Sequence, residues 1–315
     1  MAAVTGPEYS FSPPAGPSAS GRRRRTLIAV VVAWMVVVAG LAVWSVRRDP
    51  ATVPEQRDIA QALPELQRAA GVVFAAAGGP GRAVLLGDLK VSRDCQITPV
   101  RAGVIAARDV TVYVRAGEVR AGIEAIAAAL PKSYRASLSI GRGATEYALH
   151  ADAGNFIGID ADLNAGEQAL TLAVSSGCRP LVSGELDRSD PAAGPAPAAL
   201  GAVLAALGAS GTPSGSDVSP APSTTVSPSL SGATSSAAPG VAAQAVACPR
   251  GGTTGTYTVD GVAAPADLGG SLRGVLSGAS VIWSGANGWA YRTGDDSVVV
   301  QVDGKRLRVS ASTAC

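Results

Sequence analysis

An uncharged run of 21 residues, from Thr26 to Val46, constrains this chain more than any other feature. At about 1.5 Å per residue it would form a helix about 31 Å long, which matches the hydrocarbon core of a bilayer. Four arginines (Arg22, Arg23, Arg24 and Arg25) precede the run, whereas two arginines and an aspartate follow it. This asymmetry predicts a cytoplasmic N-terminus and an extracytoplasmic C-terminal bulk. We therefore expect a single-pass protein of the cell membrane, with a transmembrane helix over 26–46 and the lipid bilayer as its first partner.

A cleaved signal peptide is the alternative interpretation of the same run. Gly40 and Ala42 are small enough for signal peptidase, so cleavage after Ala42 stays open. The long Val-rich core and the long N-terminal stretch favour an uncleaved signal anchor instead. Trp44, near the outer end, suits an interfacial aromatic anchor.

All four cysteines follow the apolar run, at Cys95, Cys178, Cys248 and Cys315. None forms a C-x-x-C pair, and one histidine cannot complete a Cys/His zinc set. An even number of cysteines in an oxidising compartment indicates two disulfides. Of the three pairings, we favour Cys95–Cys178 and Cys248–Cys315, because a low-complexity stretch separates the two couples.

Composition divides the chain into five parts. Residues 1–25 are a Pro- and Ser-rich tail that ends in the arginine cluster, and we expect this tail to be disordered. After the span come a domain over 50–190, a linker over 191–247 and a smaller module over 248–315. The linker is rich in Ala, Pro, Ser and Thr, so we expect disorder there, apart from a short helix within 195–207. Whether it is glycosylated stays open.

The domain over 50–190 is expected to be α+β with an antiparallel sheet. A capping box at Thr52–Glu55 and helical periodicity from Ile59 to Val73 predict a first helix, which Pro64 should kink or split. Apolar spacing predicts a second helix from Val119 to Leu130. Strand-like runs fall at 83–86, near 104, and at 109–114, 134–140, 146–151, 156–161 and 169–174.

The last 68 residues repeat this pattern. A strand over 256–259 precedes a helix over 268–275, and four strands follow, with hairpin turns at Asn287-Gly288 and Asp303-Gly304. Three runs of the first domain (148–151, 157–162 and 170–178) align with 290–293, 298–303 and 307–315. We therefore expect two diverged copies of one disulfide-closed βαββββ module, each with a helix packed on an antiparallel sheet. The first copy should carry extra N-terminal elements.

The chain also resembles single-pass membrane proteins of actinobacteria to which no activity is assigned. The shared features are the Pro-rich tail, the arginine cluster, the Val-rich span ending in Trp44-Ser-Val-Arg47, and the closing Ser310-Ala-Ser-Thr-Ala-Cys315. The resemblance implies the signal-anchor topology with Cys-closed extracytoplasmic domains, and it adds no site residue.

Two candidate sites lie in the strands of the first domain. His150, the only histidine, falls on the polar face of its strand, and no G-x-S-x-G motif accompanies it, so we interpret it as an exposed strand histidine. Asp160, Asp162 and Asn164 have the opening spacing of a calcium loop. Gly166 comes one place late, however, and Thr171 stands where the bidentate glutamate belongs, so turn polarity is the simpler interpretation.

The remaining candidates are aromatic and acidic. Trp283, Trp289 and Tyr291 flank one hairpin and are weak candidates for a ligand surface that stacks on sugars, although cross-strand packing explains them too. Glu118 with Glu124, or Asp152 with Asp160, could serve as a glycosidase acid pair only if spaced about 5–9.5 Å apart. Gly78–Gly81 lacks the Lys-Ser/Thr of a phosphate loop, and we interpret it as a turn.

These observations favour a binding or assembly protein of the bacterial cell envelope, without a catalytic residue, metal or cofactor. The formal net charge is only +2, so no basic field for nucleic acid exists. The expected partner is another envelope protein or a cell-wall polymer. A hydrolase of envelope substrates and a signalling adaptor that acts through the short tail are the alternatives.

Overall fold

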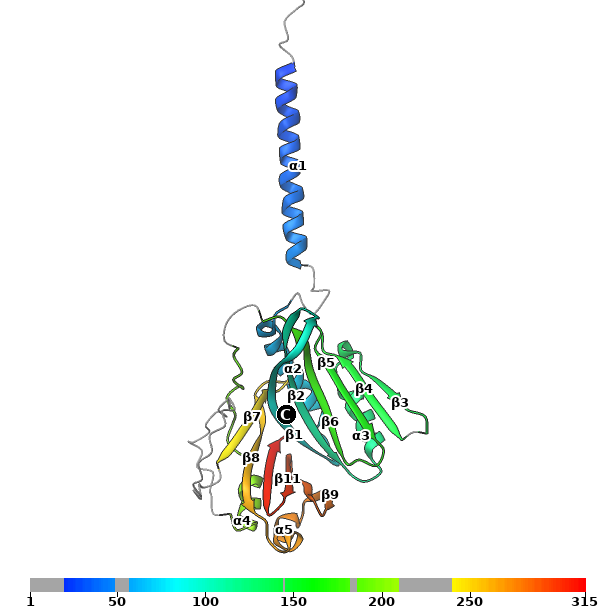
Figure 1. Cartoon of the computed structure of the whole chain (residues 1–315), viewed down its shortest axis with the longest axis vertical. Coiled ribbons are helices and arrows are strands. Elements are labelled where there is room, and N and C mark those ends of the chain that lie inside the picture. The colour runs from blue at the N-terminus through cyan, green and yellow to red at the C-terminus, as the bar shows by residue number, and fades with distance from the viewer. Residues whose placement is uncertain (1–19, 49–56, 144, 182–185, 210–239) are drawn as a thin grey trace, which may run out of the picture. The chain divides into compact units, whose positions relative to one another are not determined.

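The computed structural model describes residues 20–48, 57–143, 145–181, 186–209 and 240–315 (Figure 1). Three predictions fall outside these residues: the disorder of the N-terminal tail before residue 20, the capping box at Thr52–Glu55, and the disorder of the linker over 210–239. The described chain forms two compact units, residues 1–51 and 52–315.

The first unit contains helix α1 (Ser20–Arg48). Its stretch Arg24–Trp44 has a mean hydropathy of 2.7, and none of that stretch is buried inside the protein. By length and composition the helix is able to cross a membrane, and a signal sequence near the N-terminus has the same properties. It begins before the predicted Thr26 because arginine is a good helix former.

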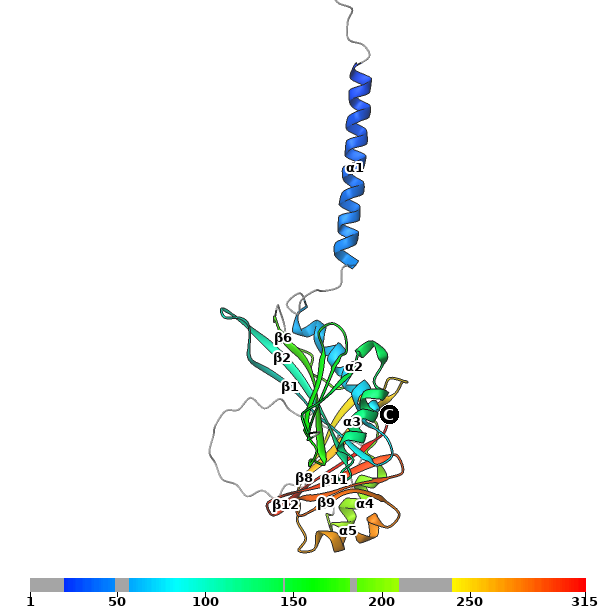
Figure 2. The same ribbon diagram turned by 90° about the vertical axis from the view of Figure 1, so that its right-hand side faces the viewer.

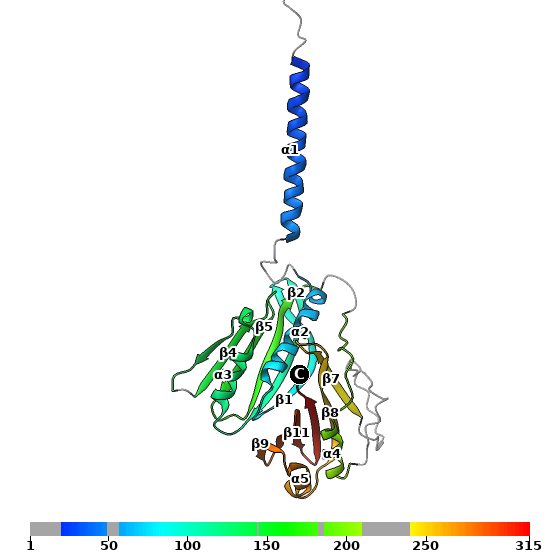
Figure 3. The same ribbon diagram turned by 180° about the vertical axis from the view of Figure 1, so that it is seen from behind.

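The second unit begins with what we term the first module, which runs from α2 to β6. Its six strands form an antiparallel sheet, sheet A, in the order β1-β2-β6-β5-β4-β3. Helices α2 and α3 cover one face of this sheet (Figure 3). The elements are α2 (Ile59–Ala77), β1 (Arg82–Thr98), β2 (Arg101–Val114), α3 (Val119–Ala129), a 3-10 turn (Lys132–Tyr134), β3 (Ser137–Ile140), β4 (Glu146–Asp152), β5 (Gly158–Asn164) and β6 (Ala169–Arg179).

Helix α2 is continuous through Pro64. Pro64 removes one backbone hydrogen bond, and the packing of the apolar face on the sheet keeps the helix whole, so the predicted split does not occur. Asp58 is the N-cap, and its side chain accepts a hydrogen bond from Gln61 N. The apolar face of the helix, including Ile59, Leu66 and Val73, is fully buried against the sheet.

The second module, from α4 to β12, has the same architecture. Sheet B has the strand order β7-β8-β12-β11-β10-β9, and α4 and α5 lie on its face away from the first module (Figure 2). The elements are α4 (Ala198–Ala206), β7 (Val241–Ala247), β8 (Thr253–Ala263), α5 (Leu268–Leu276), β9 (Ser280–Gly285), β10 (Gly288–Thr293), β11 (Asp296–Asp303) and β12 (Arg306–Thr313). Both modules are thus α+β, as the sequence predicts.

The internal repeat is more complete than expected. Each module runs helix, two strands, helix, four strands, and the two strand orders are identical. The prediction of extra N-terminal elements on the first copy is therefore wrong. Helix α4 and strand β7 complete the second copy, although both lie inside the 191–247 stretch assigned to the linker.

The strand pairing also refines the alignment of the two copies. The segments 170–178 and 307–315 correspond, as aligned, and their neighbours then match Ile159 with Val298 and Ala151 with Tyr291. The sequence alignment placed β4 and β5 two residues away from this register. Because side chains alternate between the faces of a strand, a shift of two keeps every residue on its predicted face.

Candidate functional surface

The cysteines pair as expected, Cys95 with Cys178 and Cys248 with Cys315. Their Cα atoms are 5.9 Å and 5.5 Å apart, respectively. Each disulfide joins the end of the first strand of its module to the end of the last strand, so the two bonds occupy equivalent places in the repeat. This pairing is typical of a protein that folds in an oxidising compartment.

His150 lies on β4 with its side chain 65% exposed. Its Nδ1 is 2.7 Å from Oδ1 of Asp160, the residue directly opposite on β5. The pair is a cross-strand contact on the face of sheet A that carries no helix. We term this face, and its equivalent in sheet B, the outer face.

The calcium-loop candidates do not form a loop. Asp160, Asp162 and Asn164 are alternate residues of strand β5, so they line one face about 7 Å apart. The amide nitrogen Nδ2 of Asn164 donates to Glu167 at 2.9 Å. Among the described residues, no three Asp, Glu, His or Cys side chains gather closely enough to hold a metal ion.

The three aromatic candidates do not share a surface. Tyr291 is 1% exposed in the core between sheet B and its helices, and burial raises its pKa to about 12. Trp289 packs against the same core. Trp283 lies on the opposite face, where its ring is 5.5 Å from that of Tyr113 in the first module. These positions are packing contacts, and they leave no shared platform for a sugar.

Three of the four candidate carboxylates of the acid pairs lie beside an arginine, and the fourth, Asp160, pairs with His150. Glu124 binds Arg120 at 2.8 Å on α3, and Asp152 binds Arg135 at 2.7 Å. Glu118 lies 3.9 Å from Arg115. These are surface ion pairs, which typically contribute about 0–1 kcal/mol.

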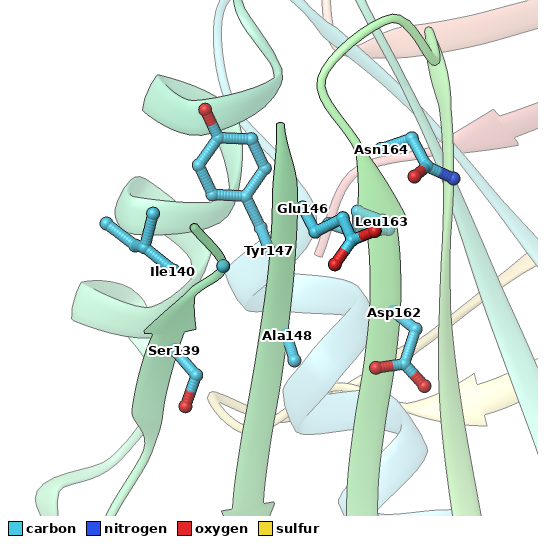
Figure 4. Close-up of a pocket in the computed structure, with 9 residues that line it drawn as sticks. Ser139, Ile140, Glu146, Tyr147, Ala148, Asp162, Leu163 and Asn164 are labelled. Atoms are coloured by element: carbon cyan, nitrogen blue, oxygen red, sulfur yellow. The ribbon is translucent and has the colours of Figure 1, made fainter. Parts of the chain in front are cut away.

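The outer face of sheet A is open and polar. A pocket of about 350 Å³ lies at its β3–β5 end, where Glu146, Asp162 and Asn164 lie on neighbouring strands (Figure 4). Ser139, Ala148 and Asp162 are opposite one another on β3, β4 and β5 and line the same pocket. Towards β6, Asp160 and Ala173 continue the face. Small and acidic side chains thus dominate this surface.

Part of the equivalent face of sheet B is covered by the first module, whereas Asp260, Asp303 and Arg308 at its other end are exposed. Three hydroxyls, Thr256 on β8, Ser312 on β12 and Ser297 on β11, lie opposite one another in a single line, which we term the hydroxyl row. All three residues are 5% exposed or less. The row faces the unpaired edge of β1.

Each hydroxyl of this row satisfies a backbone group of β1. Leu86 N donates to Thr256 Oγ1 at 2.7 Å, and Val84 N donates to Ser297 Oγ at 3.1 Å. The Ser312 hydroxyl donates to the carbonyl oxygen of Val84. A sheet edge is normally satisfied by another strand or by water, so these side chains replace a missing strand.

Arg292 on β10 extends the same line. Its Nη1 donates to the carbonyl oxygen of Gly79 at 2.7 Å and reaches that of Arg82 at 3.5 Å. The Gly78–Gly81 turn therefore ends α2, as predicted, and also contacts the second module. A pocket of about 580 Å³ between this turn and residues 292–295 remains at the junction.

On the other side of the junction, a buried arginine joins the two modules. Arg108 on β2 is fully buried and binds both carboxylate oxygens of Asp190, at 2.8 Å and 2.6 Å. The same carboxylate accepts a hydrogen bond from Ala245 N on β7 at 2.8 Å. Arg108 also donates to the carbonyl oxygens of Gly87 and Ala245. One buried ion pair thus joins strands of both modules.

Sequence patterning did not predict the hydroxyl row or the buried Arg108. Polar residues alternating with apolar ones on a strand normally predict a solvent-exposed face. The available signal was a contrast between the repeats: residues 254–258 and 310–312 carry only Thr, Ser, Ala, Gly and Tyr, without a charge. An uncharged polar face is typical of a surface that another part of the protein covers.

No protein-family model matches this chain, and no curated protein matches it. Among solved structures it is similar to the crystal structure of a DUF4853 family protein from Actinomyces odontolyticus ATCC 17982. That similarity has 16% sequence identity and a TM-score of 0.29, and it covers 44% of this chain and 78% of the other. A likeness at this level assigns neither a family nor an activity to the chain.

Proposed function

We propose that this chain is a single-pass protein of the bacterial cell envelope that binds or assembles another envelope component outside the membrane. In this proposal α1 is an uncleaved signal anchor in the bilayer, Arg22–Arg25 lie in the cytoplasm, and both modules lie outside. The apolar helix and its flanking arginines support the topology. The two disulfides support an oxidising location for the modules.

The contrast between the two outer faces is the observation that carries the binding role. In sheet B this face is buried, and Ala290 and Val299 pack there against Ala83 and Tyr113 of the first module. The same two positions in sheet A hold His150 and Asp160, which are exposed and bound to each other. Sheet B uses this face for a contact within the chain, whereas sheet A contributes Ala83 and Tyr113 at its β1–β2 end and keeps the rest of the face polar and open.

Topology is tested on intact spheroplasts of cells that produce the full chain. We expect added protease to digest residues 57–315, and thiol labelling without reduction to find no free cysteine. Protection of that region, or four reactive thiols, would remove the proposal. A mature N-terminus at residue 43 would show cleavage after Ala42 and contradict the anchor.

The binding role is tested by placing a photo-crosslinking amino acid at Ala173, on the open outer face. The matched control carries it at Ala129, which is exposed on α3, on the helical side of the same sheet. We expect a discrete crosslinked species in cells from position 173 and not from position 129. Equal crosslinking from both positions, or none from 173, contradicts the proposed binding surface.

A further inference from the structure

The second module shows how this fold holds a polypeptide segment on its outer face. The segment Arg82–Leu86 runs across sheet B from β10 to β8. Its backbone meets Arg292, then Ser297 and Ser312, then Thr256, so successive strands each provide a side chain. Alternate residues of an extended chain are about 6.6 Å apart and strands are about 4.8 Å apart, so five residues span four strands.

The first module has an equivalent line of four residues. Matched through the paired strands, Thr256 corresponds to Ala107, Ser312 to Ser175, Ser297 to Gly158 and Arg292 to Asp152. We term the line Ala107, Ser175, Gly158 and Asp152 the open row. All four of its residues are partly exposed, whereas the hydroxyl row is buried.

Side-chain size allows a backbone to approach the open row. Three of its four residues are Ala, Ser and Gly, and the next line holds Ala173 beside Asp160. With small side chains on several neighbouring strands, no bulky group projects from this face. The same property lets β1 lie close to sheet B. The Ser175 hydroxyl lies at the position from which Ser312 binds a backbone carbonyl.

The charge of this face differs between the modules. Where Arg292 donates hydrogen bonds to carbonyl oxygens in the second module, Asp152 carries a carboxylate in the first. The neighbouring positions add Asp160 in place of Val299 and Asp162 in place of Gln301. Glu146 lies beyond them in the pocket of Figure 4. Asp152 and Asp160 pair with Arg135 and His150, and Asp162 and Glu146 add two further carboxylates, so an occupant that supplies positive charge and hydrogen-bond donors suits this face.

The first strand of each module, β1 and β7, already has its outer edge occupied within this chain. The free edge of β1 is held by the hydroxyl row. The equivalent strand of the second module, β7, has its free edge bound at Ala245 to Asp190 and Arg108. Its Val246 is buried in the core of the first module. Neither of these two edges is free to cover sheet A, so we take the covering segment from another molecule.

Building on the proposed binding function, we infer that the outer face of sheet A binds an extended polypeptide segment rich in lysine or arginine from a partner protein. The segment crosses β2, β6, β5 and β4 over the open row, in the way that Arg82–Leu86 crosses sheet B. Its backbone lies on Ala107, Ser175 and Gly158, and its cationic side chains pair with Asp160 and Asp162.

The test uses the full chain in lipid nanodiscs and a fluorescent peptide, acetyl-(Thr-Arg)4-amide, with binding followed by anisotropy at low salt. Three probes separate charge from backbone recognition. One is the (Thr-Glu)4 peptide, one is the (Thr-Arg)4 peptide with N-methyl groups on alternate residues, and one is spermine. We expect saturable binding of (Thr-Arg)4, at least tenfold weaker binding of the N-methylated peptide, and no binding of (Thr-Glu)4.

Two variants test whether the peptide binds on the outer face of sheet A. Asp160→Asn combined with Asp162→Asn removes two exposed charges, and we expect it to weaken peptide binding about tenfold. Ala173→Arg adds bulk and positive charge at the centre of the face, and we expect it to abolish binding. The matched control, Asp260→Asn with Asp303→Asn, removes two exposed charges from sheet B and should leave affinity within twofold of the parent chain. Circular dichroism confirms that each variant is folded.

Several outcomes overturn the inference. If the N-methylated peptide or spermine binds as well as (Thr-Arg)4, charge alone is recognised and the extended-segment claim fails. If the sheet B control loses as much affinity as the sheet A double variant, the site is misplaced. Absence of peptide binding while position 173 still crosslinks in cells rejects this partner chemistry but keeps the proposed function. If neither peptide binding nor crosslinking at position 173 is observed, both the inference and the proposed function are rejected.

Discussion

At the scale of single residues, the junction between the modules depends on a few buried polar side chains. Thr256 accepts a hydrogen bond from the otherwise unpaired Leu86 N. Thr256→Val keeps the shape of the side chain and leaves that N–H buried without an acceptor. We therefore expect the free energy of unfolding to fall by about 1–3 kcal/mol. Thr171→Val, on the exposed face of β6, is the control and should change stability by about 0.5 kcal/mol or less. Denaturant titration measures both, and equal effects would contradict the role given to the hydroxyl row.

Arg108 is the second such residue. Its guanidinium is fully buried, and it binds a carboxylate that also holds Ala245 N. Arg108→Met removes the partner of a partly buried charge, so we expect a loss of about 3–5 kcal/mol. The control, Arg120→Met, breaks the exposed Arg120–Glu124 pair on α3 and should cost about 0.5 kcal/mol or less. A loss in Arg108→Met no larger than in the control would show that the pair does not fasten the junction.

Tyr291 gives the protein a specific response to alkali. Burial disfavours the phenolate and raises its pKa from the ordinary 10 to about 12. The stability due to this shift is complete below pH 10 and is lost as the pH rises to about 12, by about 2–3 kcal/mol at most. Tyr291→Phe lacks the ionisable group, so its stability should fall less over this window than that of the parent chain. Parallel curves for the two proteins between pH 9 and 12 would contradict the assignment.

At the scale of elements, two glycines in helices should respond to alanine in opposite ways. An added Cβ at Gly71 in α2 would lie 2.1 Å from the carbonyl oxygen of Ala247 in β7. We expect Gly71→Ala to destabilise the protein by about 1–3 kcal/mol, because the helix must move away from that strand. Gly201 in α4 has nothing within 4 Å, so Gly201→Ala should stabilise by about 0.5–1 kcal/mol. Thermal unfolding of the two variants checks both signs, and stabilisation by Gly71→Ala would show that α2 does not pack closely on β7.

The contact between α2 and β7 also shows why some elements could be predicted from the sequence and others could not. The helices from Ile59 and Val119 and the strands of the last meander have strong periodicity, and the structure confirms them. Strand β7 has the sequence Val-Ala-Ala-Gln-Ala-Val-Ala, which has no strong strand signal. It is a strand because it forms a hairpin with β8 and packs on Gly71, and the contact with Gly71 joins residues far apart in the chain. A local pattern carries no trace of such contacts.

The candidate surface shows the same limit. The sequence placed His150 on the polar face of its strand, and the structure finds it exposed and paired with Asp160, which lies in β5 and not in the turn that the sequence suggested. Polar residues at alternate strand positions are ordinarily exposed, yet Thr256 and Ser312 are buried. Patterning determines which side of a strand a residue occupies, whereas only the packing of the two modules determines whether that side meets water or protein. The aromatic candidates were ambiguous for the same reason.

At the scale of the whole molecule, the sequence predicted two separate modules joined by a linker, and the structure shows one compact unit from residue 52 to 315. The hydroxyl row, the Arg108–Asp190 pair and the α2–β7 contact lie at different places along the junction. Separation of the two modules would expose Leu86 N, Asp190 and Val246 together. Cooperative unfolding is therefore expected, because neither module keeps its buried polar groups satisfied without its neighbour.

Removing one disulfide tests this coupling. The Cys248–Cys315 bond closes a loop with a sequence separation of 67, for which chain entropy predicts about 4–5 kcal/mol of stabilisation. In the variant Cys248→Ala with Cys315→Ala, we expect calorimetry of the full chain to show a single transition for both modules, shifted to lower temperature. The Cys95→Ala with Cys178→Ala variant, separated by 83 residues, should shift the same transition by a similar amount. Two separate transitions, with only the second module destabilised by the first variant, would mean that the junction does not couple the modules and that sheet B holds β1 only weakly.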